Sequence, residues 1–446
     1  MHRYFLILSL TVAVLFSCIQ HPVYLENDLV RKIEHSGDTY TVHLDGRKYV
    51  DTVVLEEAYD SVWDFEIAAK VDNQWKTVYR QDRIDKYRIC VLDGTETDTL
   101  KITILKKEGN VRINKVSAYD SSSFSRKRPI VVSEYMTTEK GKLDKIKASP
   151  DYANHFRVID DIILIGEVFL DKQGKIQYKE GKEDFINDLK MIREIKPEIN
   201  IIVDIDIHKQ TGKDGTETKN LLNAKRKEIV AEMVAFADET RIQGIDFDWE
   251  YPRTLAEWGA YSELIVALHA ELEKSNRYIT VALAPWGGSL SREACRAIKY
   301  VNLMTYDLFD DRGEHASFYN TTEKSVAKFL SITHFKKEQL FLGLSFYGRT
   351  VNQSPNAWPD FRYDYEHGKT MGKWGNYIYD YPYEEDGVRK TSHGYVNGYA
   401  MARDKTAYAL YSDLGGIMIF RFICDAPYSY EYSLHKAVET MINKNK

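Results

Sequence analysis

The segment RIQGIDFDWEYP (Arg241–Pro252) places three acids at every second position, Asp246, Asp248 and Glu250, with apolar residues between them. Successive side chains of a β-strand point to opposite faces, so this spacing predicts a column of carboxylates opposite an apolar surface. In a parallel barrel, helices cover the outer face of each strand. We therefore expect the acids to point into a barrel, with Glu250 nearest the C-terminal mouth, where barrel enzymes carry their active sites.

Other strand-like runs precede and follow this segment, and most are separated by helical patterns. One helical pattern is TLAEWGAYSELIVALHAELEK (254–274), whose apolar residues recur three or four apart. The runs are IVVSEYM (130–136), DDIILIGEVFL (160–170), INIIVDIDIH (199–208), YITVALAPW (278–286), YVNLMTYDLF (300–309), LFLGLSFYG (340–348) and GGIMIF (415–420). This alternation predicts an α/β fold, a (β/α)8 TIM barrel over residues 127–446. The surplus length between Arg349 and Leu414 is expected to lie over the top of the barrel.

Residues 38–122 have a different pattern, with short strand-like runs at intervals of roughly ten residues and turn signals between them. They predict a small all-β sandwich of the jelly-roll type. The order of the runs resembles the discoidin-type jelly rolls appended to many glycosidases. Such modules bind sugar or pack against the catalytic domain, and we favour packing because no sugar-binding motif is present. Ser121–Pro129 is a polar junction between the two domains.

The N-terminus, MHRYFLILSLTVAVLFSC, has a short basic start and an apolar run too short for a good transmembrane helix. We interpret residues 1–17 as a signal peptide and 18–37 as a lipidated Cys18 with a linker. The segment before Cys18 resembles the lipobox of bacterial lipoproteins, and plain signal cleavage is the alternative. The resemblance implies a lipid-anchored protein of the bacterial envelope, at the outer membrane or cell surface in a Gram-negative cell.

The amino-acid composition limits the classes of binding partner. The net charge of −6 argues against nucleic acid, which needs a basic surface. The 31 tyrosines suit a sugar ligand, although tyrosine is also a common core residue. Cys90, Cys295 and Cys424 are too widely spaced for a disulfide framework or a zinc set, and we expect buried thiols, with one disulfide pair among them as the alternative. We expect a monomer whose only contact with a membrane is the lipid anchor.

Three carboxylates in a confined interior are unfavourable unless they share a proton, bind a cation or are held by donors. Two chemical uses compete: a hard metal bound by several oxygens, and one acid kept protonated by the others so that it can donate to a leaving group. A solvated acidic strand is the third interpretation.

Four motifs in order resemble glycoside hydrolase family 18, the family of chitinases and endo-β-N-acetylglucosaminidases. GIDFDWEYP is similar to its D-G-x-D-x-D-x-E signature, NLMTYDLF to its Met-x-Tyr-Asp strand, LGLSFYGR to its Gly-x-x-x-Tyr-Gly-Arg strand and GGIMIF to its last strand. The resemblance spans roughly residues 127–446. It implies catalysis without metal or cofactor, in which the substrate's own 2-acetamido group replaces a carboxylate nucleophile.

Carried over by position, Glu250 would be the general acid that protonates the glycosidic oxygen. Asp248 would orient the acetamido group and stabilise the oxazolinium ion, and Asp246 would share a proton with Asp248. Tyr306 would hydrogen-bond the acetamide. The resemblance implies further substrate contacts at Met304, Asp307, Trp286, Tyr347, Arg349 and Phe420; for Trp286, Tyr347 and Arg349, packing of the barrel is an equal alternative.

The sequence departs from the family pattern at three places. Gln243 replaces the first Asp of the signature, where we expect a structural effect only. The run INIIVDIDIH carries Asp204, Asp206 and His208 on one face, and their role is open. Phe420 stands where the family usually has a Trp under the sugar. Compared with Trp, Phe offers less stacking area and no N–H.

These features together predict a retaining hydrolase of β-1,4 bonds in N-acetylglucosamine-containing glycans. The substrate would be chitin or its oligosaccharides, or the chitobiose core of N-glycans. The alternatives are a non-catalytic glycan-binding lipoprotein and a metal-dependent hydrolase.

Overall fold

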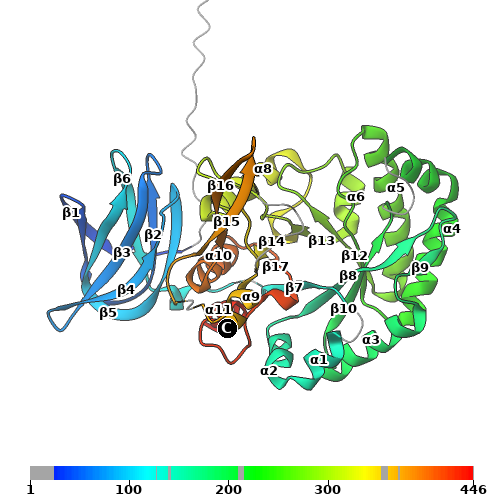
Figure 1. The fold of residues 1–446 in the computed structure, drawn as a ribbon, viewed down its shortest axis with the longest axis horizontal. Coiled ribbons are helices and arrows are strands. Elements are labelled where there is room, and N and C mark those ends of the chain that lie inside the picture. Colours follow the sequence, from blue (N-terminus) through cyan, green and yellow to red (C-terminus); the bar gives the residue numbers. More distant parts are fainter. Residues whose placement is uncertain are drawn as a thin grey trace, which may run out of the picture.

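The computed structural model describes residues 25–126, 128–138, 142–208, 215–352, 360–369 and 372–444. An all-β domain precedes a barrel, and the two lie side by side (Figure 1). The predicted signal peptide and Cys18 lie outside the described residues, as does part of the predicted linker. No helix within the described ranges is long and apolar enough to cross a membrane.

The N-terminal domain is an antiparallel sheet in the order β1-β2-β5-β3-β4, with β6 also paired to β2. Its strands are β1 (Val30–Ser36), β2 (Thr39–Glu57), β3 (Val62–Val71), β4 (Gln74–Gln81), β5 (Tyr87–Lys107) and β6 (Ile113–Tyr119). β2 and β5 are long and have register shifts, so they bend around a core that includes Val42, Phe65 and Ile102. The predicted all-β domain is confirmed, whereas its likeness to discoidin modules stays a prediction.

Eight parallel strands in the described part of the chain close into a barrel, because β10 pairs with both β8 and β11 while β17 pairs with both β14 and β7. The barrel strands are β7 (Val131–Met136), β8 (Asp161–Leu170), β10 (Asn200–Asp206), β11 (Gly244–Phe247), β12 (Tyr278–Leu283), β13 (Ile298–Leu303), β14 (Leu340–Ser345) and β17 (Gly416–Phe420). A short strand, β9 (Ile176–Tyr178), runs antiparallel to β8. The predicted TIM barrel is confirmed.

Helices surround the barrel on the outside. They are α1 (Lys142–Ala148), α2 (Pro150–Ala153), α3 (Lys182–Ile195), α4 (Gly215–Thr240), α5 (Leu255–Leu272), α6 (Arg292–Ala297), α7 (Phe318–Thr321), α8 (Glu323–Ile332), α10 (Tyr399–Tyr411) and α11 (Leu434–Lys444). α5 begins as its sequence suggests, since Thr254 and Glu257 form a capping box there. Its apolar face packs on the outer faces of the strands.

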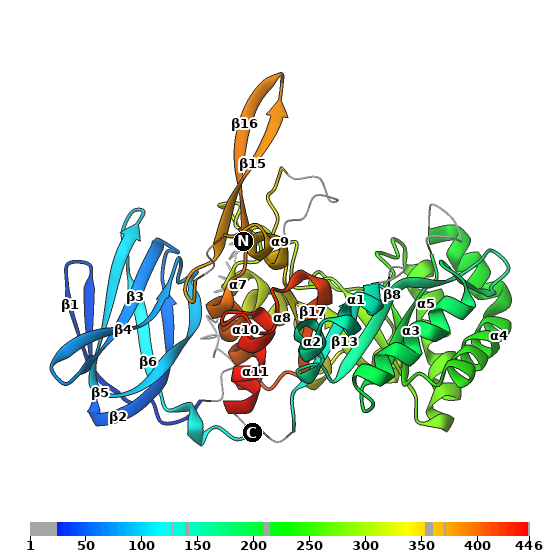
Figure 2. The same ribbon diagram turned by 60° about the horizontal axis from the view of Figure 1, so that its bottom comes forward.

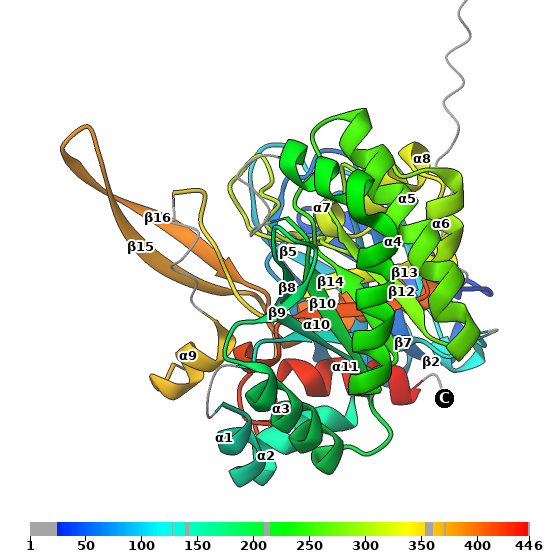
Figure 3. The same ribbon diagram turned by 90° about the vertical axis from the view of Figure 1, so that its right-hand side faces the viewer.

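Between β14 and α10 the chain forms α9 (Phe361–Glu366) and a hairpin of β15 (Tyr377–Glu385) and β16 (Val388–Val396). The hairpin projects away from the body of the molecule (Figures 2 and 3). The expectation that the whole stretch from Arg349 to Leu414 covers the barrel is wrong for α10. That helix lies between the barrel and the N-terminal domain, and each of its residues is buried (Figure 1).

Two charged residues of α10 pair across this interface. Asp404 accepts hydrogen bonds from Tyr79 Oη (2.6 Å) and Arg88 Nη2 (3.0 Å) of the N-terminal domain. Arg403 Nη2 donates to the carbonyl of Val91 (2.7 Å). A buried charge is tolerated only when it is paired, so these bonds make the N-terminal domain an integral part of the fold. This observation supports its predicted packing role.

Candidate active site at the mouth of the barrel

Asp246 is fully buried inside the barrel, although it is a carboxylic acid. Tyr135 of β7 donates its hydroxyl hydrogen to Asp246 Oδ2 (2.8 Å), Thr280 of β12 donates to Oδ1, and the Asn302 amide of β13 lies 3.5 Å from Oδ1. The donors come from three other strands of the ring. The side chain therefore points into the barrel, as the alternation in β11 predicts.

The surroundings of Asp246 set its proton affinity. Burial disfavours the charged form and raises the pKa of Asp246 to about 6, although hydrogen bonds from Thr280, Tyr135 and Asn302 each act to lower it. A carboxyl group with a pKa near 6 can both hold and release a proton close to neutral pH. It can therefore exchange a proton with a neighbouring acid during a reaction.

β11 ends at Phe247, so Asp248 and Glu250 lie beyond the strand rather than on it. Just beyond the strand, the Asp248 N–H donates to the Asp204 side chain (Oδ1, 3.1 Å). Asp204 is itself buried and stands opposite Asp246 in the register of β10 and β11. The second acidic strand thus positions the backbone of the signature segment.

Asp206 and His208 support the same segment from the side. The His208 N–H donates to Asp206 Oδ1 (3.0 Å), and the His208 ring stacks on Trp249 at 6.2 Å between centroids. Gln243 has the expected structural place at the start of β11. Its N–H donates to the Ile201 carbonyl and its Oε1 accepts the Ile201 N–H, both at 2.8 Å.

Glu250 is exposed at the mouth of the barrel, whereas Tyr306 beside it is buried. Burial raises the pKa of the Tyr306 hydroxyl well above its ordinary value, and the charges of Asp248, Asp307 and Glu250 raise it further. Burial and the same three carboxylates also raise the pKa of Tyr251. The structure therefore brings three predicted acids and Tyr306 within electrostatic range of one another.

Asp307 is held by three side chains at the end of β13. It accepts a hydrogen bond from Tyr347 Oη (2.9 Å), pairs with Arg349 Nη1 (2.7 Å) and lies 3.3 Å from His315 Nε2. Burial alone would raise the pKa of Asp307, but His315, Arg349 and Tyr347 outweigh burial and lower it. Asp307 is thus a fixed negative charge. Tyr347 and Arg349, predicted as substrate contacts, hold Asp307 in place.

Aromatic rings line the floor of this region. The Phe420 ring lies 5.7 Å from that of Tyr306, 5.9 Å from Tyr347 and 6.0 Å from Tyr135. Phe420 is partly exposed, so a flat ligand could stack on it. Met304 is buried at the end of β13.

Trp286 lies at the edge of the site. Its side chain is 51% exposed, and it touches the site through Tyr251, whose ring lies 5.7 Å from its own. An exposed indole at the edge of a site can contact only a ligand that extends beyond the central residues.

Sequence reasoning missed Tyr135, Thr280, Asn302 and His315. Each of the first three sits on a barrel strand at a position that alternation places on the inner face, among apolar neighbours. A polar residue at an inward position was the available signal. His315 lies in a loop, and only the fold brings it to Asp307.

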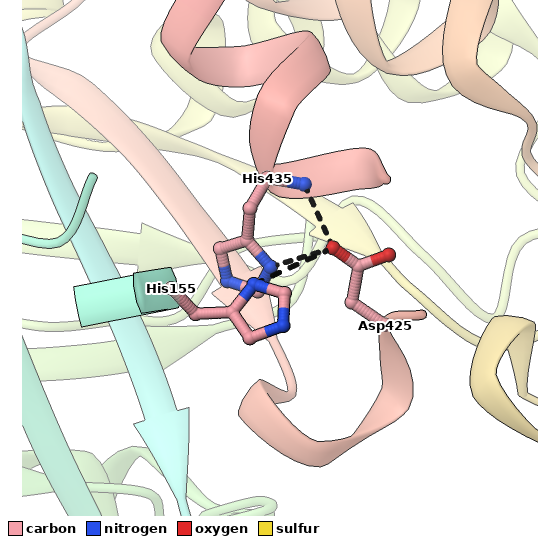
Figure 4. Close-up of side chains that lie close together, drawn as sticks. All are labelled: His155, Asp425 and His435. Atoms are coloured by element: carbon pink, nitrogen blue, oxygen red, sulfur yellow. Dashed lines mark hydrogen bonds and ion pairs between the residues drawn. The ribbon is translucent and has the colours of Figure 1, made fainter. Parts of the chain in front are cut away.

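One group of donors in the described residues has the spacing of a metal site: His155, Asp425 and His435, all buried (Figure 4). His435 Nδ1 lies 2.8 Å from Asp425 Oδ2, and Nε2 lies 2.9 Å from Glu134 Oε2. Burial lowers the pKa of His435, but the two carboxylates outweigh it and raise it to about 10. Both ring nitrogens therefore donate to carboxylates, and the group acts as an ion network that joins α11 to β7.

The arrangement at the mouth suits acid chemistry on an uncharged polar substrate. An exposed carboxyl group at Glu250 can reach a bound molecule, Asp246 can store a proton, and the Tyr306 hydroxyl remains protonated at any physiological pH. The aromatic floor offers stacking to a flat ring.

Comparison with known proteins agrees with this geometry. The model of the family "Glycosyl hydrolases family 18" matches residues 132–425. Chitinase 1 of Aphanocladium album is 25% identical over 185 residues, which cover 35% of this chain and 42% of that protein. A probable endochitinase of Caenorhabditis elegans is 26% identical over 160 residues, 30% of this chain and 26% of that protein. The chain thus spans less than half the length of these curated relatives.

Solved structures show the same fold. The family 18 chitinase ChiB of Flavobacterium johnsoniae superposes with a TM-score of 0.54 at 22% identity, covering 70% of this chain and 94% of that one. A class V chitinase of Nicotiana tobaccum gives a TM-score of 0.54 at 15% identity, with 71% and 100% covered. The family model spans more than half of the chain, and with the barrel and its acidic mouth this shows that the protein belongs to glycosyl hydrolase family 18.

Proposed function

We propose that this protein hydrolyses β-1,4 bonds between N-acetylglucosamine units of a chitin-type glycan, with retention of configuration. The observation that carries the proposal is the combination of a buried Asp246, with a pKa of about 6, inside the barrel and an exposed Glu250 at its mouth, within electrostatic range of Tyr306. The names of the relatives favour chitin and its oligosaccharides over the chitobiose core of N-glycans.

In the proposed reaction, Glu250 transfers its proton to the glycosidic oxygen while the acetamido oxygen of the bound sugar attacks the anomeric carbon. The carbon–oxygen bond breaks, the leaving sugar departs as an alcohol, and a cyclic oxazolinium ion remains. Asp248 accepts the acetamido N–H and balances the positive charge, with Asp246 supplying or taking up a proton. Water, deprotonated by the Glu250 carboxylate, then opens the ring and restores the acetamide.

Turnover of a chromogenic chitobioside tests the proposal. Glu250→Gln removes the transferable proton with little change in volume, so kcat should fall at least about a hundredfold while binding of chitotetraose is kept. Glu239→Gln is the matched control, because Glu239 is exposed and pairs with Lys182 at the surface. Binding without turnover in the unmodified protein would favour a non-catalytic glycan-binding protein. Activity that survives in Glu250→Gln would assign the acid elsewhere.

Two comparisons refine the substrate and the mechanism. A panel of chitin oligosaccharides against high-mannose and complex N-glycans distinguishes a chitinase from an endo-β-N-acetylglucosaminidase. A matched glycoside without the 2-acetamido group should not be cleaved, because the internal nucleophile is missing. Equal cleavage of that glycoside contradicts the mechanism.

We also propose export and lipid anchoring through Cys18, supported by the basic start and apolar run of residues 1–16. Cys18→Ser should move the protein from the membrane fraction to the soluble fraction of cells. An unchanged distribution would contradict the anchor.

A further inference from the structure

The loop after β13 connects the mouth of the barrel with the N-terminal domain. It leaves the site at Asp307 and returns at His315, where the Asp307 N–H donates to His315 Nε2 (3.1 Å). Within the loop, Phe309 and His315 form a β-bridge, and the Asp310 N–H donates to the Glu314 carbonyl (3.2 Å). The loop is therefore a compact hairpin with its base in the site and its tip at Asp310–Glu314.

The base of this hairpin fixes Asp307. His315 is fully buried, and burial is the first cause that lowers its pKa. Its Nε2 accepts the Asp307 N–H, and its Nδ1 lies 3.4 Å from the Tyr395 carbonyl. The position of His315 thus determines the position of the Asp307 backbone, and Tyr306 is the adjoining residue.

The tip of the hairpin is held from the other domain by Arg83. The side chain of Arg83 is 5% exposed, and its Nη1 donates to both Asp310 Oδ2 and Glu314 Oε2, the latter at 2.6 Å. Its Nη2 donates to Asp60 of the N-terminal domain (2.9 Å). One nitrogen therefore binds the barrel loop, and the other binds the domain that carries Arg83. Only a guanidinium offers this fork; a lysine would have a single point charge.

The charges around Arg83 explain why the tip depends on it. Four carboxylates surround the guanidinium within 4.0 Å: Asp60, Asp85, Asp310 and Glu314. Burial, and then the neighbouring acids, raise the pKa of Glu314 to about 8 even though Arg83 acts to lower it. Without the cation, the crowded acids of the two domains would repel one another or take up protons, and either change would remove the ion pairs at the tip. The loop tip would then lose this attachment to the N-terminal domain.

We propose that Arg83 is a positioning residue for the active site: it clamps the hairpin tip to the N-terminal domain and so holds Asp307 and Tyr306 in their working places. This rests on the proposed function, because those two residues contact substrate only if the mouth is the site of hydrolysis. The N-terminal domain is then part of the catalytic scaffold, even though it contributes no group to the reaction.

The test compares two Arg→Lys variants of the full chain. Arg83→Lys keeps a positive charge but cannot bridge both sides, and Arg80→Lys is the matched control, because Arg80 pairs with Asp64 on the exposed face of the same domain. Displacement of a positioning group by about 1 Å can cost on the order of a hundredfold in rate. We expect kcat on the chitobioside to fall at least tenfold in Arg83→Lys, with a smaller change in KM, and to stay within twofold in Arg80→Lys.

A rescue experiment separates positioning from general damage to the fold. Adding Glu314→Gln to Arg83→Lys removes one acid from the buried cluster and keeps an amide oxygen as acceptor for the introduced ammonium group. This change should recover part of kcat, whereas it would not restore a fold that is merely weakened. Asp60→Asn is the second route if Arg83→Lys does not fold. This substitution weakens the contact between Arg83 and Asp60, whose side chain is 20% exposed, and it should lower kcat by less than Arg83→Lys does.

Each outcome decides one claim. Full kcat in folded Arg83→Lys, or in Asp60→Asn if Arg83→Lys does not fold, overturns the proposal. No turnover by the unmodified protein on any substrate of the panel overturns the proposed function instead. In that case, binding of chitotetraose still tests the clamp. The affinity of Arg83→Lys, or that of Asp60→Asn in its place, is compared with the affinity of Arg80→Lys. Equal affinities would refute it.

Discussion

Asp404→Asn should destabilise the protein strongly, because it breaks a buried ion pair from one side only. Asp404 of α10 and Arg88 of β5 are both 0% exposed, and Arg88 Nη2 lies 3.0 Å from Asp404 Oδ2. Burial lowers the pKa of Arg88, but Tyr79 and Asp404 outweigh it, so Arg88 keeps its charge. Asparagine has nearly the same volume, but its NH2 group replaces one of two oxygens that both accept hydrogen bonds, Oδ1 from the Val91 N–H (3.0 Å) and Oδ2 from Tyr79 and Arg88. The change therefore removes the counter-charge and one acceptor together.

Removing one partner of a buried pair typically costs about 3–5 kcal/mol, whereas an exposed pair contributes about 0–1 kcal/mol. We expect the first range for Asp404→Asn, measured as the shift in the urea midpoint at an unchanged slope. Asp413→Asn is the matched control, since Asp413 is 31% exposed and pairs with Arg128 at 3.1 Å. Unfolding of both variants at the same urea concentration would refute the reasoning, because Asp404 would then not be acting as a buried counter-ion.

Three further predictions concern the barrel and its ion network. The pKa of His435 in the folded protein, about 10, exceeds its ordinary value of 6.5, so protonation of His435 contributes stability that is complete below pH 6.5 and lost as the pH rises through about 10. The urea midpoint of unfolding should therefore fall over that pH range, and it should fall less in His435→Gln. Gly343→Ala would place a Cβ 2.5 Å from the Leu303 carbonyl oxygen, so it should lower the melting temperature, and an unchanged value would contradict the strand spacing. Burial raises the thiol pKa of Cys295 to about 11 and that of Cys424 to about 12, so Ellman's reagent should react with them only after unfolding, and rapid reaction of the native protein would be inconsistent with this burial.

The strands and the inward direction of the acids could be predicted from the sequence, because both are local properties. A strand with one buried face must alternate, and the acids of the segment that begins with β11 alternate with Ile245, Phe247 and Trp249. The order of the strand motifs also indicated the family. The partner of the Asp248 N–H was not local, since it is the side chain of Asp204, 44 residues earlier in the chain.

The proton affinity of Asp246 is a tertiary property for the same reason. Its donors, Tyr135, Thr280 and Asn302, lie 111, 34 and 56 residues away along the chain. Alternation tells which side of a strand a residue faces, but it does not tell which residues of other strands stand at the same height in a closed ring. Only the closure of the barrel sets that height, and with it the pKa.

The interface between the domains shows the limit most clearly. Arg403, Asp404 and Lys405 in the middle of α10 have the charge of a solvent-exposed turn of helix, yet the structure buries all three. Lys405 Nζ donates to the Ala316 carbonyl (2.7 Å), and the other two pair with the N-terminal domain. The sequence by itself determined two domains, a barrel and an acidic strand, because hydrophobic periodicity reports which faces avoid water. Only the tertiary structure decided which charges leave water together, because a buried charge is stable only beside a partner that folding supplies from another part of the chain.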